Sequence, residues 1–169
     1  MYIYPTPTIS RTIAVELFSS EFKSARRDLL IDKLLGRNNR LLSFPERQGL
    51  SNRKFLGVRE IQVKNIIGTI GRNYDFDRKF RPLKSHLRER WVNMLTNLDT
   101  ENWPPILVHK IGDNFYVEDG HHRASVARSI GRAYISAEVW EYASDCSRCT
   151  NYPEQYAAVR CHSAESCFA

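Results

Sequence analysis

The stretch FYVEDGHHRASVARSIG, residues 115–131, places two adjacent histidines and an arginine between an apolar run and a pattern of helical spacing. A second apolar run, ILVHKI (106–111), precedes it. The two runs are separated by Gly112, Asp113 and Asn114, which is typical of a strand hairpin. Residues 133–142, AYISAEVWEY, alternate apolar and polar side chains and predict a strand. We therefore expect a hairpin, a helix that begins at His121 and ends at Gly131, and a final strand.

The first third of the chain predicts one helix followed by a connection. Apolar residues recur at helical spacing over residues 17–35. Ser19 or Ser20 is the expected N-terminal cap of this helix, and Gly36 is placed to end it. Turn-forming and basic residues over 36–54 then predict a loop.

The middle of the chain predicts a strand, a loop and a second helix. Residues 57–66 are short and β-branched, the glycines and aspartates of 68–82 favour a loop, and residues 83–98 carry an apolar stripe at helical spacing. The order of elements indicates an α+β fold, a small mixed sheet flanked by helices. The expected core consists of Leu87, Trp91, Leu95, Ile106, Val108, Val117, Ala127, Ile130, Ile135 and Val139.

Length and composition indicate one globular domain with additions at both ends. We expect a helical N-terminal extension (1–56), the α+β domain (57–142) and an irregular Cys-rich tail (143–169) in a chain of 169 residues. No run of 18 apolar residues and no basic leader followed by an apolar core is present, so we expect no membrane partner and a cytoplasmic location. The formal net charge of +6 is compatible with anionic partners.

The junction at residues 119–123 has the features of an anion site. The first N–H groups of a helix lack intrahelical partners, and the helix dipole makes that end partly positive. Asp119 is the expected N-cap, Gly120 allows close approach of the backbone to a ligand, and Arg123 offers a planar fork to phosphate oxygens. His121 and His122 add donors or a base. The alternative is structural: Asp119 caps the helix, Arg123 pairs with it and both histidines lie at the surface.

Residues 57–142, about half of the chain, resemble the ParB/sulfiredoxin superfamily domain. The resemblance rests on the strand REIQV, the loop GTIGR, the helix that carries RERW, and the segment PPILVHKIGDNFYVEDGHHRASVARSIGRAYISAEV. In that superfamily a glycine, two variable residues and an arginine at a helix start form a corner that binds nucleotide phosphates. Residues 120–123 occupy this corner here, and the DGHHR version is most similar to the free-serine kinases of the superfamily.

The resemblance implies a nucleotide-binding protein. It implies a nucleoside di- or triphosphate bound with Mg²⁺ and either hydrolysed or used to pass phosphate to a small acceptor. Arg123 would offset charge on the transferred group, His122 would hold a phosphate oxygen, and the catalytic candidates His121 or Asp119 would orient the acceptor or metal. Sulfiredoxins carry a cysteine at the position of His121, so sulfinic-acid repair is not expected.

The alternative function is a DNA-associated module or nuclease. The 27 residues after Tyr142 (143–169) are too few for the helix-turn-helix and dimerisation segments of chromosome-partitioning relatives, so we expect a chain without them. DNA binding requires a basic stripe. The dense candidates for such a stripe are Arg37, Arg40, Arg47, Arg53 and Lys54.

Two further groups of residues are metal or ligand candidates. Arg72 ends the loop GTIGR and by resemblance lies near the nucleotide, whereas Asp75 and Asp77 offer the oxygen ligands that suit Mg²⁺, or merely form solvated turns. The tail offers a C-x₂-C pair and further thiols for a structural Zn²⁺, with reduced thiols or disulfides as alternatives. These zinc candidates are Cys146, Cys149, Cys161, His162 and Cys167.

Overall fold

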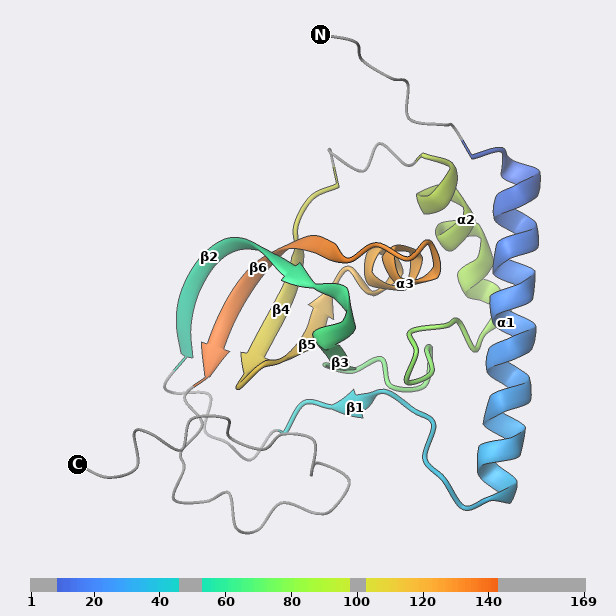
Figure 1. Cartoon of the computed structure of the whole chain (residues 1–169), viewed down its shortest axis with the longest axis horizontal. Helices are drawn as coiled ribbons and strands as arrows, with labels where there is room; N and C mark the ends of the chain where they lie inside the picture. Colours follow the sequence, from blue (N-terminus) through green and yellow to red (C-terminus); the bar gives the residue numbers. More distant parts are fainter. Residues whose placement is uncertain (1–8, 46–52, 98–102, 143–169) are drawn as a thin grey trace, which may run out of the picture.

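A computed structural model describes residues 9–45, 53–97 and 103–142 of the chain (Figure 1). Three α-helices, two 3₁₀ turns and six strands form the described part. In chain order they are α1 (Arg11–Leu34), β1 (Leu42–Ser43), β2 (Arg53–Gln62), η2 (Val63–Asn65), β3 (Ile66–Thr69), η3 (Ser85–Leu87), α2 (Arg88–Thr96), β4 (Ile106–Ile111), β5 (Asn114–Asp119), α3 (His121–Ser129) and β6 (Tyr134–Tyr142).

The six strands form one mixed sheet in the order β1-β3-β5-β4-β6-β2. The pairs β4–β5 and β2–β6 are antiparallel, whereas β1–β3, β3–β5 and β4–β6 are parallel. The hairpin β4–β5 is the predicted one, and β6 returns beside β4 after helix α3. The expected α+β fold with a small mixed sheet is therefore confirmed.

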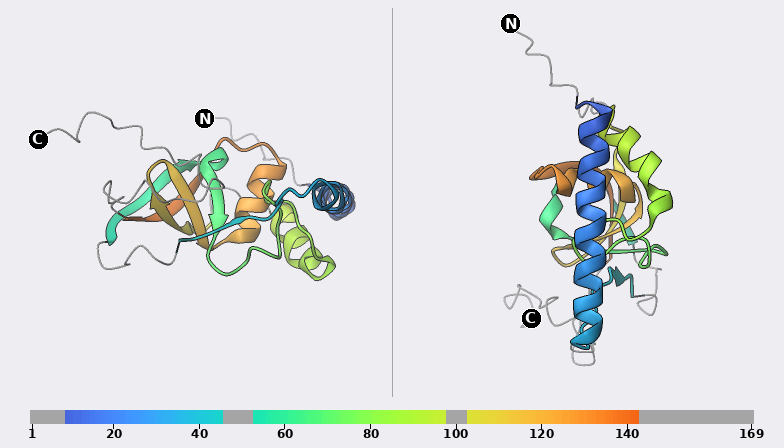
Figure 2. Two further views of the ribbon diagram at one scale, coloured as in Figure 1. Left: turned by 90° about the horizontal axis from the view of Figure 1, so that it is seen from below. Right: turned by 90° about the vertical axis from the view of Figure 1, so that its right-hand side faces the viewer.

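Helices cover one side of the sheet in successive layers (Figure 1, Figure 2). Helix α3 lies next to the sheet, α2 packs against α3, and α1 packs against α2 along the outside of the molecule. The buried face of α1 includes Ala14 and Phe18, and the Phe18 ring meets the edge of the Trp91 ring from α2 at 5.7 Å between centroids. The N-terminal helix is therefore part of the domain's packing.

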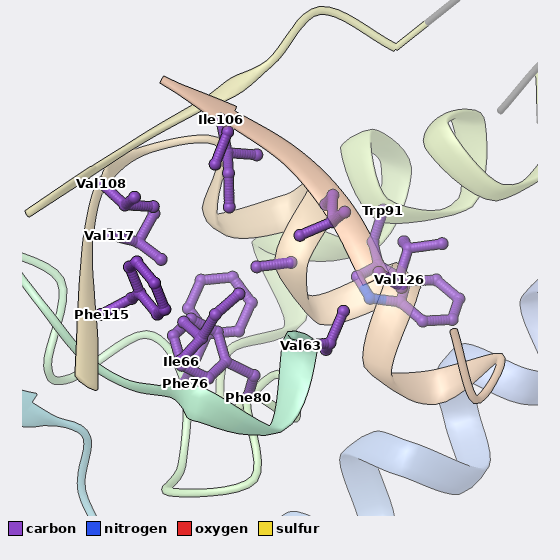
Figure 3. Packing of buried hydrophobic residues seen from close by; sticks show 14 of the residues in the cluster. Val63, Ile66, Phe76, Phe80, Trp91, Ile106, Val108, Phe115, Val117 and Val126 are labelled. Carbon is purple, nitrogen blue, oxygen red and sulfur yellow. The ribbon is translucent and has the colours of Figure 1, made fainter. Parts of the chain in front are cut away.

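The main core lies between the sheet and helices α2 and α3 (Figure 3). Ile106 and Val108 of β4 pack there with Val126 of α3 and with Trp91, whose indole N–H donates a 2.9 Å hydrogen bond to Ser125 Oγ. Nine of the ten predicted core residues are buried. The tenth, Ile130, is partly buried against the same cluster.

The sequence predicted the C-terminal ends of two helices correctly and the N-terminal end of the first helix incorrectly. Gly36 and Gly131 follow α1 and α3 with positive φ, as predicted, and the N–H of the next residue reaches back to a carbonyl of the last turn in both cases. The predicted start of the first helix was wrong. Helix α1 begins at Arg11, where Ser10 caps it, whereas the Ser19 hydroxyl donates to the Val15 carbonyl within the helix.

The regions predicted as loops contain more structure than their composition suggests. Residues 36–54 include β1 and the start of β2, so the boundary expected after residue 56 falls inside a strand. The short apolar strand β3 follows η2 and was not predicted. Within 68–82, Phe76 and Phe80 are fully buried core residues. The second helix is shorter than predicted, because a 3₁₀ turn replaces its first residues.

None of the helices in the described ranges combines the length and the apolar composition that a membrane crossing requires.

Candidate functional site

The turn from β5 into α3 depends on Gly120. Its backbone has φ +93°, and a Cβ added there would lie 2.4 Å from Cγ2 of Ile106, a fully buried residue. Both the left-handed conformation and the close approach require glycine. Gly120 is the N-cap residue, and no side chain of the described residues caps the helix. The cap position therefore offers the N–H groups of the first turn no side-chain acceptor, and a helix start of this kind can bind an anion.

Asp119 is not the N-cap, so that prediction was wrong. Its carboxylate is 68% exposed and accepts a 2.7 Å hydrogen bond from Arg123 Nη2. Because Gly120 adopts the left-handed conformation, it takes the capping position one residue later than expected. The remaining capacity of the Asp119 carboxylate faces solvent beside the helix start.

Arg123 joins three segments at this corner. Besides the Asp119 contact, its Nη1 donates to the carbonyls of Pro104 and Pro105, the latter at 2.9 Å. These prolines lie directly before β4, so the guanidinium fixes the entry to that strand. Burial lowers the pKa of Arg123 and nearby Arg90 adds to this effect, while Asp119 opposes it. Arg123 therefore forms the ion pair with Asp119 that the structural alternative predicted, and its positive charge lies close to the helix start.

His121 is buried, with 4% of its surface exposed. Its Nε2 shares a 2.5 Å hydrogen bond with Thr69 Oγ1 of β3, and its ring stacks on Phe76 at 6.2 Å between centroids. Burial, with a contribution from Arg72, lowers the pKa of His121 to about 4. The imidazole is therefore neutral at pH 7 and is held in a fixed orientation.

His122 is also buried, at 7% exposure, but its polar atoms are less well satisfied. Its Nδ1 is enclosed and has no hydrogen-bond partner among the described residues. The edge of the ring contacts Phe76 at 5.6 Å between centroids. Burial lowers the pKa of His122 to about 4, and the neighbouring charges of Arg90 and Arg72 contribute. The alternative that places both histidines at the surface is thus wrong.

Positive side chains surround the two histidines. Arg90 of α2 is exposed and affects the pKa of both His122 and Arg123, and no other described residue forms a hydrogen bond or ion pair with it. Arg72 influences both histidines from the loop after β3 and forms a 3.2 Å ion pair with Asp75. The region therefore carries more positive charge than its described partners neutralise.

The two aspartates predicted as magnesium ligands are engaged by cations. Asp77 is completely buried, and its carboxylate accepts bonds from the Arg81 side chain and from two backbone N–H groups. Asp75 pairs with Lys84 at 2.8 Å and with Arg72. Burial alone would raise the pKa of Asp75, but these two cations outweigh it, so the pKa lies below its ordinary value. Within the described ranges, no three His, Cys, Asp or Glu side chains are grouped to hold a metal ion.

The residues predicted for zinc and DNA binding are not brought together in the described structure. The zinc candidates of the tail and Arg47 lie outside the described residues. Arg40 precedes β1 and stacks over Tyr74, whereas Arg53 begins β2 and stacks over Trp140. Because β1 and β2 form opposite edges of the sheet, these arginines do not form one stripe.

Sequence reasoning missed Thr69, Phe76 and Arg90. Thr69 and Phe76 hold the ring of His121, and Arg90 adds the unpaired charge beside His122. All three are distant from the DGHHR stretch in sequence and meet it only through the sheet and the packing of α2 on α3. Thr69 belongs to the segment GTIGR and Arg90 to the segment RERW, and Phe76 lies between the two. The resemblance of these segments to the superfamily was the one sequence signal that could have indicated them.

Comparisons with protein-family models, with curated proteins and with solved structures found no match to this chain. The fold and the site define a mixed α+β domain in which an uncapped helix start lies among positive side chains. Resemblance to the ParB/sulfiredoxin superfamily stays a prediction from the sequence.

Proposed function

We propose that the start of α3 binds the phosphates of a nucleoside di- or triphosphate, and that the protein hydrolyses the nucleotide or passes phosphate to a small acceptor. One observation carries the proposal: the uncapped helix start at Gly120 lies beside a buried histidine whose Nδ1 has no partner among the described residues. A site of this kind favours a ligand that brings oxygen acceptors and negative charge.

Elementary electrostatics favours phosphate over a neutral ligand. The dipole of α3 is joined by the charge of Arg72, which lowers the pKa of both histidines, and by that of Arg90, which lowers the pKa of His122 and Arg123. Arg72 thus helps to keep both histidines neutral and Arg90 helps to keep His122 neutral, so the histidines offer hydrogen bonds without adding net charge. Arg90 is the cation best placed to reach a ligand, because it is exposed and has no described partner, whereas Arg123 is bound to Asp119 and two carbonyls.

The residues fit distinct roles in phosphoryl transfer. Arg90 and the backbone N–H groups would hold phosphate oxygens and offset the charge that develops on the transferred group. Neutral His121, fixed by Thr69, would orient the acceptor or attacking water. Asp119 is exposed and close to this point, and it fits a role toward the acceptor or a metal ion.

Magnesium, when bound with the nucleotide, would supply charge neutralisation at the phosphates. Asp75 and Asp77 do not fit as its ligands, because arginine and lysine side chains already occupy their carboxylates. Asp119 fits better, since Mg²⁺ commonly uses one or two carboxylates together with phosphate oxygens and water. The positions of Arg40 and Arg53 at opposite sheet edges give no comparable support to the DNA-associated alternative.

Calorimetry with ATP, ADP, CTP and GTP in the presence of Mg²⁺ tests the proposal. We expect at least one nucleotide to bind wild-type protein, and Arg90→Ala to weaken binding about tenfold, which is the loss of a charge-assisted hydrogen bond of roughly 1.5 kcal/mol. Arg88→Ala is the matched control, because Arg88 lies on the same helix, is exposed and pairs weakly with Glu89 at 3.9 Å. Absence of binding by all four nucleotides, or equal losses in both variants, would contradict the proposal.

A further inference from the structure

A second feature of α3 lies on its side, more than one turn after the helix start. Ser125, Arg128 and Ser129 line a cavity of about 430 Å³, which continues over the loop 78–82 and reaches Glu21 of α1. The residues of the Gly120 corner do not line this cavity. It is therefore a separate place on the molecule from the proposed nucleotide site.

Arg128 is the central observation. Its guanidinium donates only to backbone carbonyls, those of Arg78 and Lys64 at 3.3 Å and that of Val63 at 3.5 Å. No carboxylate of the described chain pairs with it. Burial lowers the pKa of Arg128, while Asp77 opposes this at a distance. A half-buried guanidinium held by long bonds to neutral acceptors is poorly compensated, and an anion in the cavity would stabilise it.

The other charges of the cavity separate into paired and unpaired groups. Arg81 is paired with Asp77 and Asp28, and Lys79 lies 3.7 Å from Asp28. The Arg78 side chain is exposed and has no partner among the described residues.

Glu21 is the acidic residue of the cavity lining, and it accepts a 3.3 Å hydrogen bond from the Ser129 hydroxyl. Arg78 and Arg128 therefore leave an excess of positive charge beside hydroxyl donors.

The wall of the cavity also contains a residue with a strained backbone conformation. Phe80 lines the cavity, and its φ of +58° makes it the non-glycine residue with positive φ in the described chain. Bulky side chains rarely adopt this conformation, and such strain is concentrated at binding sites. The ring of Phe80 is buried and lies 5.7 Å from the Arg128 guanidinium, which it helps to position.

We propose that this cavity binds the dianionic phosphate group of a small phosphate monoester. Arg128 and Arg78 provide two charges without carboxylate partners, and the serine hydroxyls provide further hydrogen bonds. A phosphate dianion matches two guanidinium groups in charge and in donor geometry better than a single carboxylate does. The cavity volume lies in the usual range for small-molecule sites. The proposal does not depend on nucleotide binding at Gly120.

The tryptophan indole signals in a ¹H–¹⁵N spectrum provide the test, with phenyl phosphate as the probe at pH 8. Trp91 donates to Ser125 Oγ at the cavity wall, so its indole signal should shift saturably, while those of Trp103 and Trp140 serve as internal references. Arg128→Gln should weaken binding at least about tenfold. Arg78→Ala should weaken it about threefold or more, and it removes a side chain that forms no hydrogen bond or ion pair with a described residue.

Two control variants separate this site from its neighbours. Arg132→Ala alters an adjoining cavity of about 310 Å³ that also borders Arg128, and it should leave the Trp91 response unchanged. Arg90→Ala alters the Gly120 corner and should also leave it unchanged, whatever its effect on nucleotides.

The proposal is overturned if phenyl phosphate at up to about 10 mM leaves the Trp91 signal in place, because a site with a Kd of about 1 mM would be mostly occupied at that concentration. It is also overturned if Arg78→Ala binds as wild type does, which decides the matter even if Arg128→Gln fails to fold. DNA binding that requires Arg78 and Arg128, without any response to phenyl phosphate, would assign the surface to nucleic acid instead.

Discussion

Two regions of this molecule use charged side chains in opposite ways. In the loop 75–84, the Asp77 carboxylate is completely buried and satisfied by Arg81, and Arg81 also reaches Asp28 and Ser24 of α1. At the start of α3, Arg90 has no described partner and His122 Nδ1 is enclosed without one. The first arrangement fixes helix α1 to the domain. The second leaves unsatisfied groups, and such groups mark the place where a ligand would bind.

The largest expected effect concerns the satisfied network. Asp77→Ala removes one partner of a buried ion pair and leaves Arg81 partly uncompensated, so the free energy of unfolding should fall by about 3–5 kcal/mol. Glu89→Ala removes an ion pair with Arg11 of the same 2.5 Å length, but Glu89 is 64% exposed and the loss should stay below about 1 kcal/mol. Urea denaturation of both variants measures the difference. Equal losses would show that burial does not separate the two pairs.

A smaller loss of stability is expected at the turn that creates the helix start. Gly120→Ala forces a left-handed alanine and places its Cβ against fully buried Ile106, which should cost roughly 2–4 kcal/mol. Gly112→Ala is the control, because Gly112 also has positive φ but nothing lies within 4 Å of the added Cβ. That variant should lose only about 1–2 kcal/mol. Thermal or urea unfolding would contradict this if the two losses were the same.

Stability should also depend on pH through the buried histidines. The pKa of His121 is lowered to about 4 from an ordinary value of 6.5, so between these values the unfolded chain binds more protons than the folded one. The stabilisation is complete above pH 6.5 and is lost as the pH falls toward 4, by about 3 kcal/mol. His121→Asn should flatten this part of the curve of unfolding free energy against pH. An unchanged slope would place the titration elsewhere.

The smallest effect carries the sharpest contrast, because the same replacement should act with opposite sign at adjacent residues. His122→Leu removes an enclosed Nδ1 that has no described partner and should raise the free energy of unfolding by about 1 kcal/mol. His121→Leu deletes the bond to Thr69 Oγ1 and should lower it by about 1–3 kcal/mol. Denaturation at pH 8, where both imidazoles are neutral, is the measurement. Destabilisation of similar size in both variants would refute the distinction.

Local sequence patterns predicted the parts of the fold that local physics determines. The hairpin β4–β5, the start of α3 at His121 and strand β6 follow from periodicity, and Gly131 ends α3 because glycine accepts positive φ. Gly120 was predicted to let the backbone approach a ligand, whereas the structure shows another reason for glycine there, the close packing against Ile106.

What the sequence did not reveal depends on contacts between distant residues. Asp77 lies in a polar stretch typical of a solvated loop, yet pairing with Arg81 and α1 allows it to be buried. The prediction that Asp119 is the N-cap was wrong, because Gly120 takes the left-handed conformation at the cap position and the Asp119 carboxylate bonds to Arg123. Arg90 reaches the site only because α2 packs on α3, and no local pattern contains that information.

The most direct measurement of the central claim follows the backbone N–H signals of His121, His122 and Arg123 in ¹H–¹⁵N spectra during titration with ADP and Mg²⁺. If the helix start binds phosphate, these three amide protons should shift downfield together and saturate at one affinity, and Arg90→Ala should move the whole response to about tenfold higher ADP concentration. If ADP binds and shifts other residues while these three signals stay in place, the unsatisfied groups at Gly120 are not the phosphate site.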